Sequence, residues 1–118
     1  KGLCVKDAKV LLLGLTFKEN CPDIRNTKVT DIITELNEYG AQVDVYDPWV
    51  DASEAEHEYN ITPINQHKKG KYDAAVIAVA HDEFKQLGEH GIRALCKNTH
   101  VLYDLKYVLT AEQADCRL

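Results

Sequence analysis

The strongest constraint on the fold is a short apolar run near the start of the chain, Lys9-Val10-Leu11-Leu12-Leu13, which Gly14 ends. The run is too short for a surface helix, and it lacks the alternation of a half-exposed strand. It is typical of a strand buried on both faces, as in parallel sheets that are covered by helices. We therefore predict a strand at residues 9–13 in the interior of an α/β domain.

A helical pattern follows after a loop of polar and charged residues. Its apolar side chains recur at i, i+3, i+4 and i+7, at Val29, Ile32, Ile33 and Leu36. This spacing predicts an amphipathic helix with one face toward a sheet. Asn26 or Thr27 can cap its start, and Gly40 supplies a left-handed residue at its end.

Further strands and helices alternate along the rest of the chain. The pattern predicts strands at residues 42–46, 74–79 and 101–104, and a short edge strand at 61–64. It also predicts helices at 53–59 and 82–87, a basic turn at 68–71 and an irregular helical turn at 91–97. Such alternation forms parallel β-α-β units with right-handed crossovers. We expect a single Rossmann-like α/β domain over residues 1–118, with a parallel sheet of about five strands and helices on both faces.

Charge and hydropathy exclude several classes of partner. The formal net charge is −5, whereas a protein that binds a nucleic-acid backbone is usually basic. No apolar run is long enough to span a bilayer. The first residues do not form a signal peptide. We expect a cytoplasmic chain that binds neither nucleic acid nor membrane, and a small anion remains a possible ligand because local cations can outweigh a distant acidic surface.

The cysteines give no indication of a metal site. Cys4, Cys21, Cys96 and Cys116 form no C-x-x-C pair and no cluster with histidine. We therefore predict no metal, and we expect reduced thiols. Cys21 has no histidine near it in the sequence, so we do not expect it to act as a nucleophile.

The loop of residues 14–25 is the leading candidate site, because ligands bind beyond the carboxyl ends of the strands in such sheets. It lacks the G-x-G-x-x-G pattern that lets a backbone approach a pyrophosphate. Lys18 and Arg25 can instead contact an anion through their side chains, near the positive end of the following helix. The competing interpretation is that both cations are solvated and that Phe17 packs against the helix.

Four other residues lie where this edge of the sheet is expected. Asp47 ends the second strand, where a ribose-binding acid is often found, but the missing glycine pattern favours a structural role in the turn. Asp23 is expected to hold Arg25 or the loop backbone. His81 follows the strand at 74–79, and a structural role is favoured over a direct ligand contact. Lys106, just past the final strand, can reach the same crevice.

Residues 14–27, with the sequence GLTFKENCPDIRNT, resemble the signature G-x-x-[FY]-K-x-x-[TSC]-x-D-x-R-x-[ST] of the UDP-glucose/GDP-mannose dehydrogenase family. The signature belongs to the C-terminal, UDP-binding domain of these enzymes. The resemblance continues through residues 39–40, 45–48, 72–74 and 103–106, and so covers nearly the whole chain. The sequences of residues 17–26 and 45–51 are similar to those of bacterial enzymes that oxidise UDP-N-acetylhexosamines for capsule, Vi-antigen and O-antigen synthesis.

The resemblance implies an NAD-dependent oxidation of the C6 hydroxyl of a nucleotide sugar to a carboxylate. Phe17, Lys18 and Lys106 would then bind the UDP-sugar, and Arg25 would reach the NAD held by another domain. The family's catalytic cysteine lies in a glycine-rich segment upstream, so no catalytic residue is expected in this chain.

The resemblance therefore implies a C-terminal fragment of an oxidoreductase. The NAD-binding and central domains of the same polypeptide would be its partners, and the isolated domain would be inactive. The full-length protein would form a homo-oligomer. UDP-N-acetylglucosamine, UDP-N-acetylgalactosamine and UDP-glucose all remain possible substrates.

Two other functions stay open from the sequence. A receiver-type regulatory domain has a similar length and alternation, but it needs acids after the first and third core strands, where Gly14 and Ala80-His81 stand. A stand-alone Rossmann-like nucleotide-binding module is disfavoured by the missing glycine pattern.

Overall fold

The computed structural model describes residues 6–66 and 69–117, so Cys4 and Lys68 of the expected basic turn lie outside the described residues. Five parallel strands form one sheet in the order β2-β1-β3-β4-β5. The strands and helices in chain order are β1 (Lys9–Leu13), α1 (Val29–Glu38), β2 (Gln42–Tyr46), α2 (Ala52–Tyr59), β3 (Tyr72–Ile77), α3 (Asp82–Arg93), β4 (Cys96–Asp104) and β5 (Cys116–Arg117).

Strand β1 lies in the interior of the sheet, as the apolar run predicts. It pairs with β2 on one side and with β3 on the other. Leu11, Leu12 and Leu13 are fully buried. The chain proceeds from β1 outward in one direction and then returns to continue in the other, so the strand order reverses beside β1. Ligand crevices of open α/β sheets form at such a reversal.

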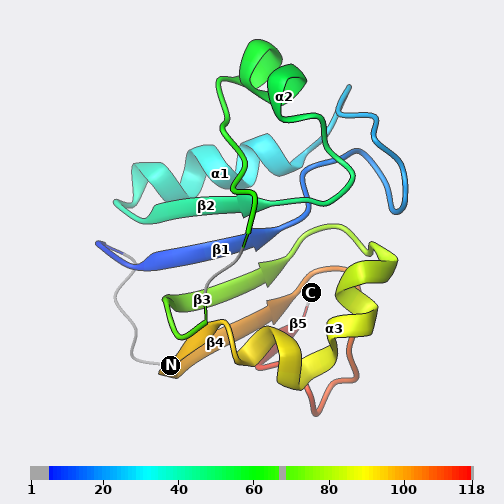
Figure 1. Ribbon diagram of the computed structural model, residues 1–118. Helices are drawn as coiled ribbons and strands as arrows, with labels where there is room; N and C mark the ends of the chain where they lie inside the picture. The colour runs from blue at the N-terminus through cyan, green and yellow to red at the C-terminus, as the bar shows by residue number, and fades with distance from the viewer. Residues whose placement is uncertain (1–5, 67–68, 118) are drawn as a thin grey trace.

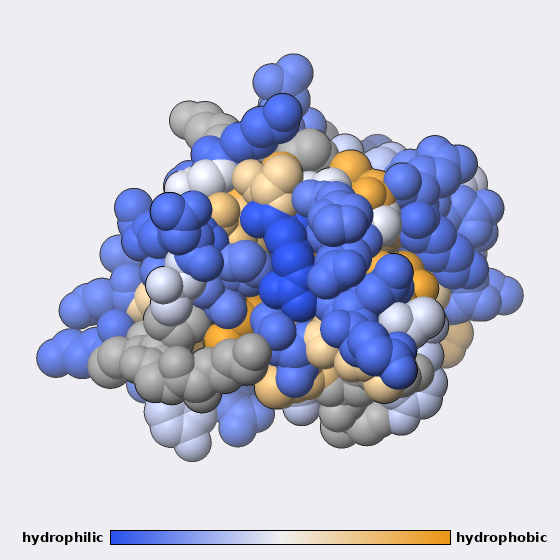
Figure 2. Space-filling view, turned by 90° about the horizontal axis from the view of Figure 1, so that it is seen from below, coloured by the Kyte–Doolittle hydropathy of each residue, from blue (hydrophilic) through white to orange (hydrophobic). Residues whose placement is uncertain are grey.

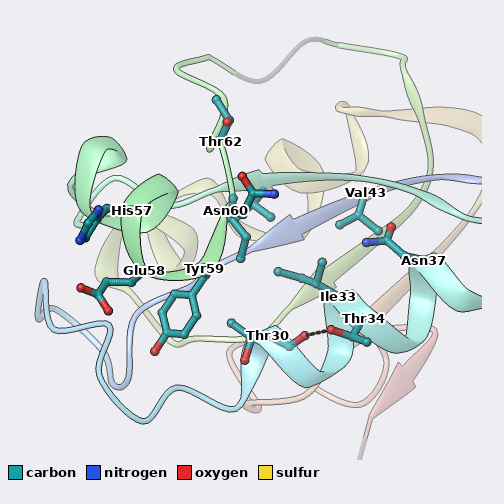
Figure 3. A pocket seen from close by; sticks show the side chains of 12 residues that line it. Thr30, Ile33, Thr34, Asn37, Val43, His57, Glu58, Tyr59, Asn60 and Thr62 are labelled. Atoms are coloured by element: carbon teal, nitrogen blue, oxygen red, sulfur yellow. Dashed lines mark hydrogen bonds between the residues drawn. The ribbon is translucent and has the colours of Figure 1, made fainter.

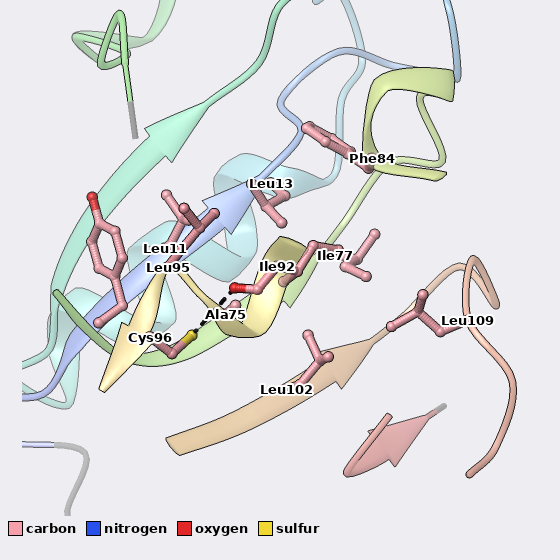
Figure 4. Close-up of a cluster of buried hydrophobic side chains, with 11 residues drawn as sticks. Leu11, Leu13, Ala75, Ile77, Phe84, Ile92, Leu95, Cys96, Leu102 and Leu109 are labelled. Atoms are coloured by element: carbon pink, nitrogen blue, oxygen red, sulfur yellow. Dashed lines mark hydrogen bonds between the residues drawn. The ribbon is translucent and has the colours of Figure 1, made fainter. Parts of the chain in front are cut away.

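The alternation of side chains along β1 divides the core into two halves. Leu11 and Leu13 pack on one face of the sheet with Phe84 and Ile92 of α3, as Figure 4 shows. Leu12 packs on the opposite face, in the cluster that contains residues of α1 and α2. Figure 1 shows the same arrangement, with α1 and α2 on one side of the sheet and α3 on the other. The predicted α/β fold with helices on both faces is confirmed.

Helix α1 begins and ends as the sequence predicts, with one refinement. Lys28 stands at the N-cap position, and the Oγ1 atom of Thr27 just before it accepts a hydrogen bond from the backbone N–H of Val29 at 3.2 Å, so Thr27 rather than Asn26 supplies the side-chain acceptor at the start. Val29 and Ile33 are buried against the sheet. Gly40 follows the helix with φ of +89°, in the left-handed region that favours glycine.

The edge strand predicted at residues 61–64 is wrong. These residues lie outside the strands, although Ile64 N–H donates to the carbonyl of Val45 at 2.8 Å. One backbone bond to β2 does not extend into the repeated bonds of a ladder. The fifth strand is instead β5, which pairs with Tyr103 and Asp104 of β4. The number of strands agrees with the prediction, but their identity differs at this one edge.

The boundaries of the second half also shift. Strand β3 starts and ends two residues earlier than predicted. Helix α3 continues to Arg93 across a kink at Gly88, where φ is 65°, and so absorbs part of the predicted turn at 91–97. Strand β4 begins at Cys96 instead of Val101, with an irregular pairing against β3 between the two.

A single arginine attaches the C-terminal segment to α3. The Arg93 guanidinium donates to Asp115 at 3.1 Å and to the carbonyl of Gln113 at 2.7 Å, and it also pairs with Glu89. Asp115 accepts the N–H of Leu102 as well, so the same carboxylate holds β4. This network places β5 at the edge of the sheet.

The surface of the protein is mainly polar on the side that is seen when Figure 1 is viewed from below. Figure 2 shows mainly hydrophilic residues there, with hydrophobic residues in small patches among them. Among the described helices, none combines the length and the apolar character that crossing a membrane requires.

Candidate functional site

A cavity of about 380 Å³ lies where the loops after β1, β3 and β4 meet the start of α1. The loop after β1 contributes Phe17 and Lys18, and the loop after β4 contributes Leu105 and Lys106. The segment after β3 lines the floor with residues 78–80. The cavity therefore lies beyond the carboxyl ends of three parallel strands, where the switch-point rule expects a ligand.

The structure brings together three of the four residues that the sequence singled out for binding. Phe17, Lys18 and Lys106 line the same cavity, although Lys106 is 88 positions from Lys18 in the chain. Their contact with a ligand stays a prediction. Phe17 is 55% exposed, so it is not part of the buried core.

Sequence reasoning missed a third lysine of the site. Lys28 stands at the start of α1 and lines the cavity together with Thr27 and Val29. The backbone N–H groups at a helix start carry partial positive charge, so the lysine and the helix end favour the same kind of ligand. Lys28 lies directly before the periodic segment that starts at Val29, and this position could have identified it as a residue of the helix start.

Arg25 does not line this cavity. Its guanidinium forms two hydrogen bonds with Asp23, at 3.0 Å from Nε and 3.1 Å from the second terminal nitrogen. The Arg25 side chain is 84% exposed. Hydrogen bonds from Arg25 hold the pKa of Asp23 below its usual value. The expectation that Asp23 holds Arg25 is confirmed, and the arginine, unlike the three lysines, is not part of the cavity lining.

Asp47 has the structural role that the missing glycine pattern favours. Its carboxylate is buried and accepts the backbone N–H groups of Leu15 at 2.6 Å, Thr16 at 3.0 Å and Trp49 at 2.8 Å. Burial raises the pKa of Asp47, but the hydrogen bond from His81 and those from the backbone outweigh it, so the pKa lies below its usual value. Asp47 thus fixes the start of the loop that carries Lys18.

His81 is buried completely and does not line the cavity. Its ring contacts Thr16, Asn20 and Asp47. These contacts agree with the structural role that was favoured for His81 and not with a direct ligand contact.

Asp104 plays the same part for the loop after β4 as Asp47 does for the loop after β1. It is fully buried and accepts the N–H groups of Lys106 at 3.0 Å and Leu109 at 2.8 Å. The two aspartates at this end of the sheet therefore turn their carboxylates toward backbone donors. Of the residues that line the cavity, Glu19 is acidic and three are lysines, so its local charge is opposite to the net charge of the chain.

A larger hollow of about 650 Å³ lies elsewhere, between α1, α2 and β2. Figure 3 shows Thr30 and Thr34 of α1 across from His57 and Tyr59 of α2. No lysine or arginine is among the described residues that line it, so it does not offer the charge that an anionic ligand requires.

The lowered pKa of Asp47 predicts how the fold responds to acid. A carboxylate whose pKa is lower in the folded state stabilises the fold above its unfolded pKa, near 4, and this contribution is lost as the pH falls through the folded pKa. We expect Asp47→Asn to lower the free energy of unfolding by about 2 kcal/mol at pH 7. The difference from the wild type should shrink as the pH falls below about 4.

Urea unfolding at a series of pH values from neutral to acid measures this difference. Asp82→Asn is the matched control, because Asp82 is exposed and its ion pair with Lys85, at 3.8 Å, is a weak surface pair. A difference between Asp47→Asn and the wild type that stays constant through the acid range would contradict the assignment.

Comparison with known proteins gives a consistent family. The model of the UDP-glucose/GDP-mannose dehydrogenase family, UDP binding domain, matches residues 11–111. UDP-N-acetyl-D-glucosamine 6-dehydrogenase of Salmonella typhi is 56% identical over 118 residues, which is 100% of this chain and 28% of that protein. The enzyme of the same name from Pseudomonas aeruginosa is 60% identical over 114 residues, which is 97% of this chain and 27% of that protein.

Solved structures agree on the fold. The crystal structure of NDP-N-acetyl-D-galactosaminuronic acid dehydrogenase from Methanosarcina mazei Go1 superposes with a TM-score of 0.81 at 22% identity, covering 95% of this chain and 23% of that one. The chain thus spans about a quarter of the length of the proteins it matches.

Proposed function

Because the chain belongs to the UDP-glucose/GDP-mannose dehydrogenase family, as its UDP-binding domain, we propose that it binds the UDP part of a UDP-N-acetylhexosamine within a longer, NAD-dependent 6-dehydrogenase. The N-acetylhexosamine is favoured by the two relatives at 56% and 60% identity, whose names specify UDP-N-acetyl-D-glucosamine.

One observation carries the proposal: three lysines and a helix start surround one cavity at the switch point of the sheet. A diphosphate bears the charge that Lys18, Lys28 and Lys106 complement, and lysine binds phosphate as a point charge from a flexible stem. Phe17 and Leu105 on the same lining give apolar surface against which a base or sugar ring can pack.

The remaining chemistry is assigned to the rest of the polypeptide. Oxidation of the C6 alcohol to a carboxylate takes four electrons, so two NAD⁺ are reduced to NADH and one water supplies the second oxygen. The nicotinamide cofactor would bind mainly to a domain outside this chain. Arg25, exposed and oriented by Asp23, would reach toward that cofactor.

The biological setting follows from the same relatives. A third, 39% identical over 113 residues, is Protein CapL of Staphylococcus aureus, which supports a place in capsule or other surface-polysaccharide synthesis. We propose that the whole enzyme acts in the cytoplasm as a homo-oligomer, and that this chain contributes substrate binding but no catalytic residue.

Parallel calorimetric titrations with UDP and with NAD⁺ test the proposal. We expect UDP to bind the 118-residue chain more tightly than NAD⁺ does, and we expect no NADH to form when a UDP-sugar and NAD⁺ are both added. Tighter binding of NAD⁺ would favour a stand-alone cofactor module instead. Formation of NADH would show that the chain holds catalytic groups of its own.

A further inference from the structure

The loop that carries Phe17 and Lys18, residues 14–20, is tied at both ends to one buried pair of side chains. At its start, Asp47 Oδ2 accepts the N–H groups of Leu15 and Thr16. At its far end, the N–H of Asn20 donates to Nδ1 of His81 at 2.9 Å. His81 and Asp47 are themselves joined, with Nε2 and Oδ2 3.0 Å apart.

The hydrogen bonds fix where the histidine carries its hydrogen. Because the Asn20 N–H donates to Nδ1, that nitrogen has no hydrogen of its own. Nε2 then carries the hydrogen and donates it toward Asp47 Oδ2, with Thr16 Oγ1 also within 3.1 Å. The Thr16 hydroxyl is left to donate to the carbonyl of Lys18, at 3.1 Å. A continuous series of hydrogen bonds therefore connects the buried pair, His81 and Asp47, with the backbone of Lys18.

Packing prevents the ring from turning away from this arrangement. The side chains of His81 and Asp47 are both fully buried. The His81 ring lies between Trp49, with ring centroids 6.1 Å apart, and Phe84, at 5.4 Å. Neither His81 nor Asp47 lines the cavity.

We infer that His81, oriented by Asp47, is a positioning residue for ligand binding: it holds the loop of residues 14–20 so that Phe17 and Lys18 face the cavity before a ligand arrives. This inference rests on the proposed function. Fixing a loop in advance removes the entropy cost of ordering it when the ligand binds. The side chains of Phe17 and Lys18 are exposed, whereas the backbone beneath them is held from inside the protein.

Two conservative variants separate the two contacts of the ring. His81→Gln keeps a donor that can reach Asp47 but offers no acceptor in the place of Nδ1. His81→Asn keeps an acceptor near the Nδ1 position, where the Asn20 N–H points, and is too short to reach Asp47 as the ring does. The two measurements are the dissociation constant for UDP by calorimetry and the hydrogen exchange rate of the Asn20 amide.

We expect His81→Gln to weaken UDP binding about tenfold and to speed exchange at Asn20. His81→Asn should restore much of the protection at Asn20, and the UDP affinity should recover with it. Ile92→Val is the control for loss of stability alone, because Ile92 is fully buried in the core on the α3 side and does not contact the loop. It should bind UDP as the wild type does.

A variant on the surface tests the side chain that helps to fix the same end of the loop. Asn20→Gly keeps the backbone N–H and accepts the local φ of 54°, but it removes the side-chain oxygen that receives the Asp82 N–H at 2.9 Å. This variant loosens the same end of the loop, and it too should weaken UDP binding.

The outcomes are distinguishable. If the wild type binds UDP and a folded His81→Gln binds it equally well, the inference is overturned and the proposed function stands. If His81→Gln does not fold, equal binding of UDP by Asp47→Asn and the wild type overturns the inference in the same way, because that substitution removes the carboxylate that orients His81 and accepts the N–H groups of Leu15 and Thr16. If the wild type itself does not bind UDP, the proposed function fails and the inference fails with it.

Discussion

Replacing Gly14 by alanine is expected to lower the free energy of unfolding by about 3 kcal/mol or more, as the sum of crowding and backbone strain. Gly14 ends β1 with φ of +107°, a conformation that L-residues with a side chain rarely adopt. A Cβ atom at this position would lie 2.6 Å from Cβ and 2.9 Å from the backbone nitrogen of Val79. The chain cannot move aside easily, because Gly14 N–H donates to the carbonyl of Tyr46 at 2.9 Å.

Urea unfolding of Gly14→Ala beside Gly70→Ala separates the two causes. Gly70 also has a positive φ, +68°, but nothing lies within 4 Å of a Cβ built there. Its substitution should therefore cost about 1 kcal/mol, from backbone strain alone. Equal losses in the two variants would show that the contact with Val79 is not a constraint on the fold.

Removing the lysines of the cavity should have the largest effect on binding. We expect Lys18→Ala and Lys106→Ala each to weaken UDP binding by about tenfold to a hundredfold, since a hydrogen bond to a charged group contributes about 1.5–3 kcal/mol. The double variant should bind more weakly than either. Calorimetry at low ionic strength gives these constants, and added salt should weaken the wild type more than the double variant.

Lys85→Ala is the matched control for loss of one positive charge. Lys85 is exposed on α3, pairs with Asp82 and does not line the cavity. It should leave the dissociation constant near that of the wild type. If Lys85→Ala weakens binding as much as Lys18→Ala does, the attraction comes from net charge and not from the cavity.

The centre of the sheet could be predicted from the sequence because local signals and burial agree there. The run at residues 9–13 is apolar throughout, and the structure buries it between two layers of helices. The spacing of Val29 and Ile33 predicted the face of α1 that packs on the sheet, and Gly40 marked its end.

The edge of the sheet could not be predicted, because its structure depends on distant contacts. Strand β5 has two residues, too few for any periodicity. It is held in place by the bonds of Arg93 to Asp115 and Gln113, which join segments 20 or more positions apart. Residues 61–64 have strand-like composition but donate only one backbone hydrogen bond to β2, from Ile64 to the carbonyl of Val45, so composition alone was misleading there.

The candidate site was also predictable only in part from the sequence. Position along the chain was enough to bring Lys18 and Lys106 to one end of the sheet, since parallel strands end at the same edge. Spacing does not specify where a side chain points, so it did not distinguish Arg25, turned toward Asp23, from the lysines that line the cavity. It also gave no sign that His81 would be buried beneath the loop.

The receiver-type alternative loses its remaining support at the same residues. Such a domain needs acids that stand free beside its lysine. Asp47, which follows β2, and Asp104, which ends β4, both bind backbone N–H groups inside the protein, so neither stands free.

The hydrogen bond from the backbone N–H of Lys106 to Asp104 has a consequence for how such a protein evolves. The carboxylate holds a peptide N–H, which nineteen of the twenty amino acids possess, and it makes no demand on the side chain at that position. Mutation can therefore exchange the side chain that lines the cavity while the main chain keeps its course. We expect descendants of one ancestral scaffold to change their nucleotide-sugar preference through single replacements at such positions, without first having to acquire a new architecture.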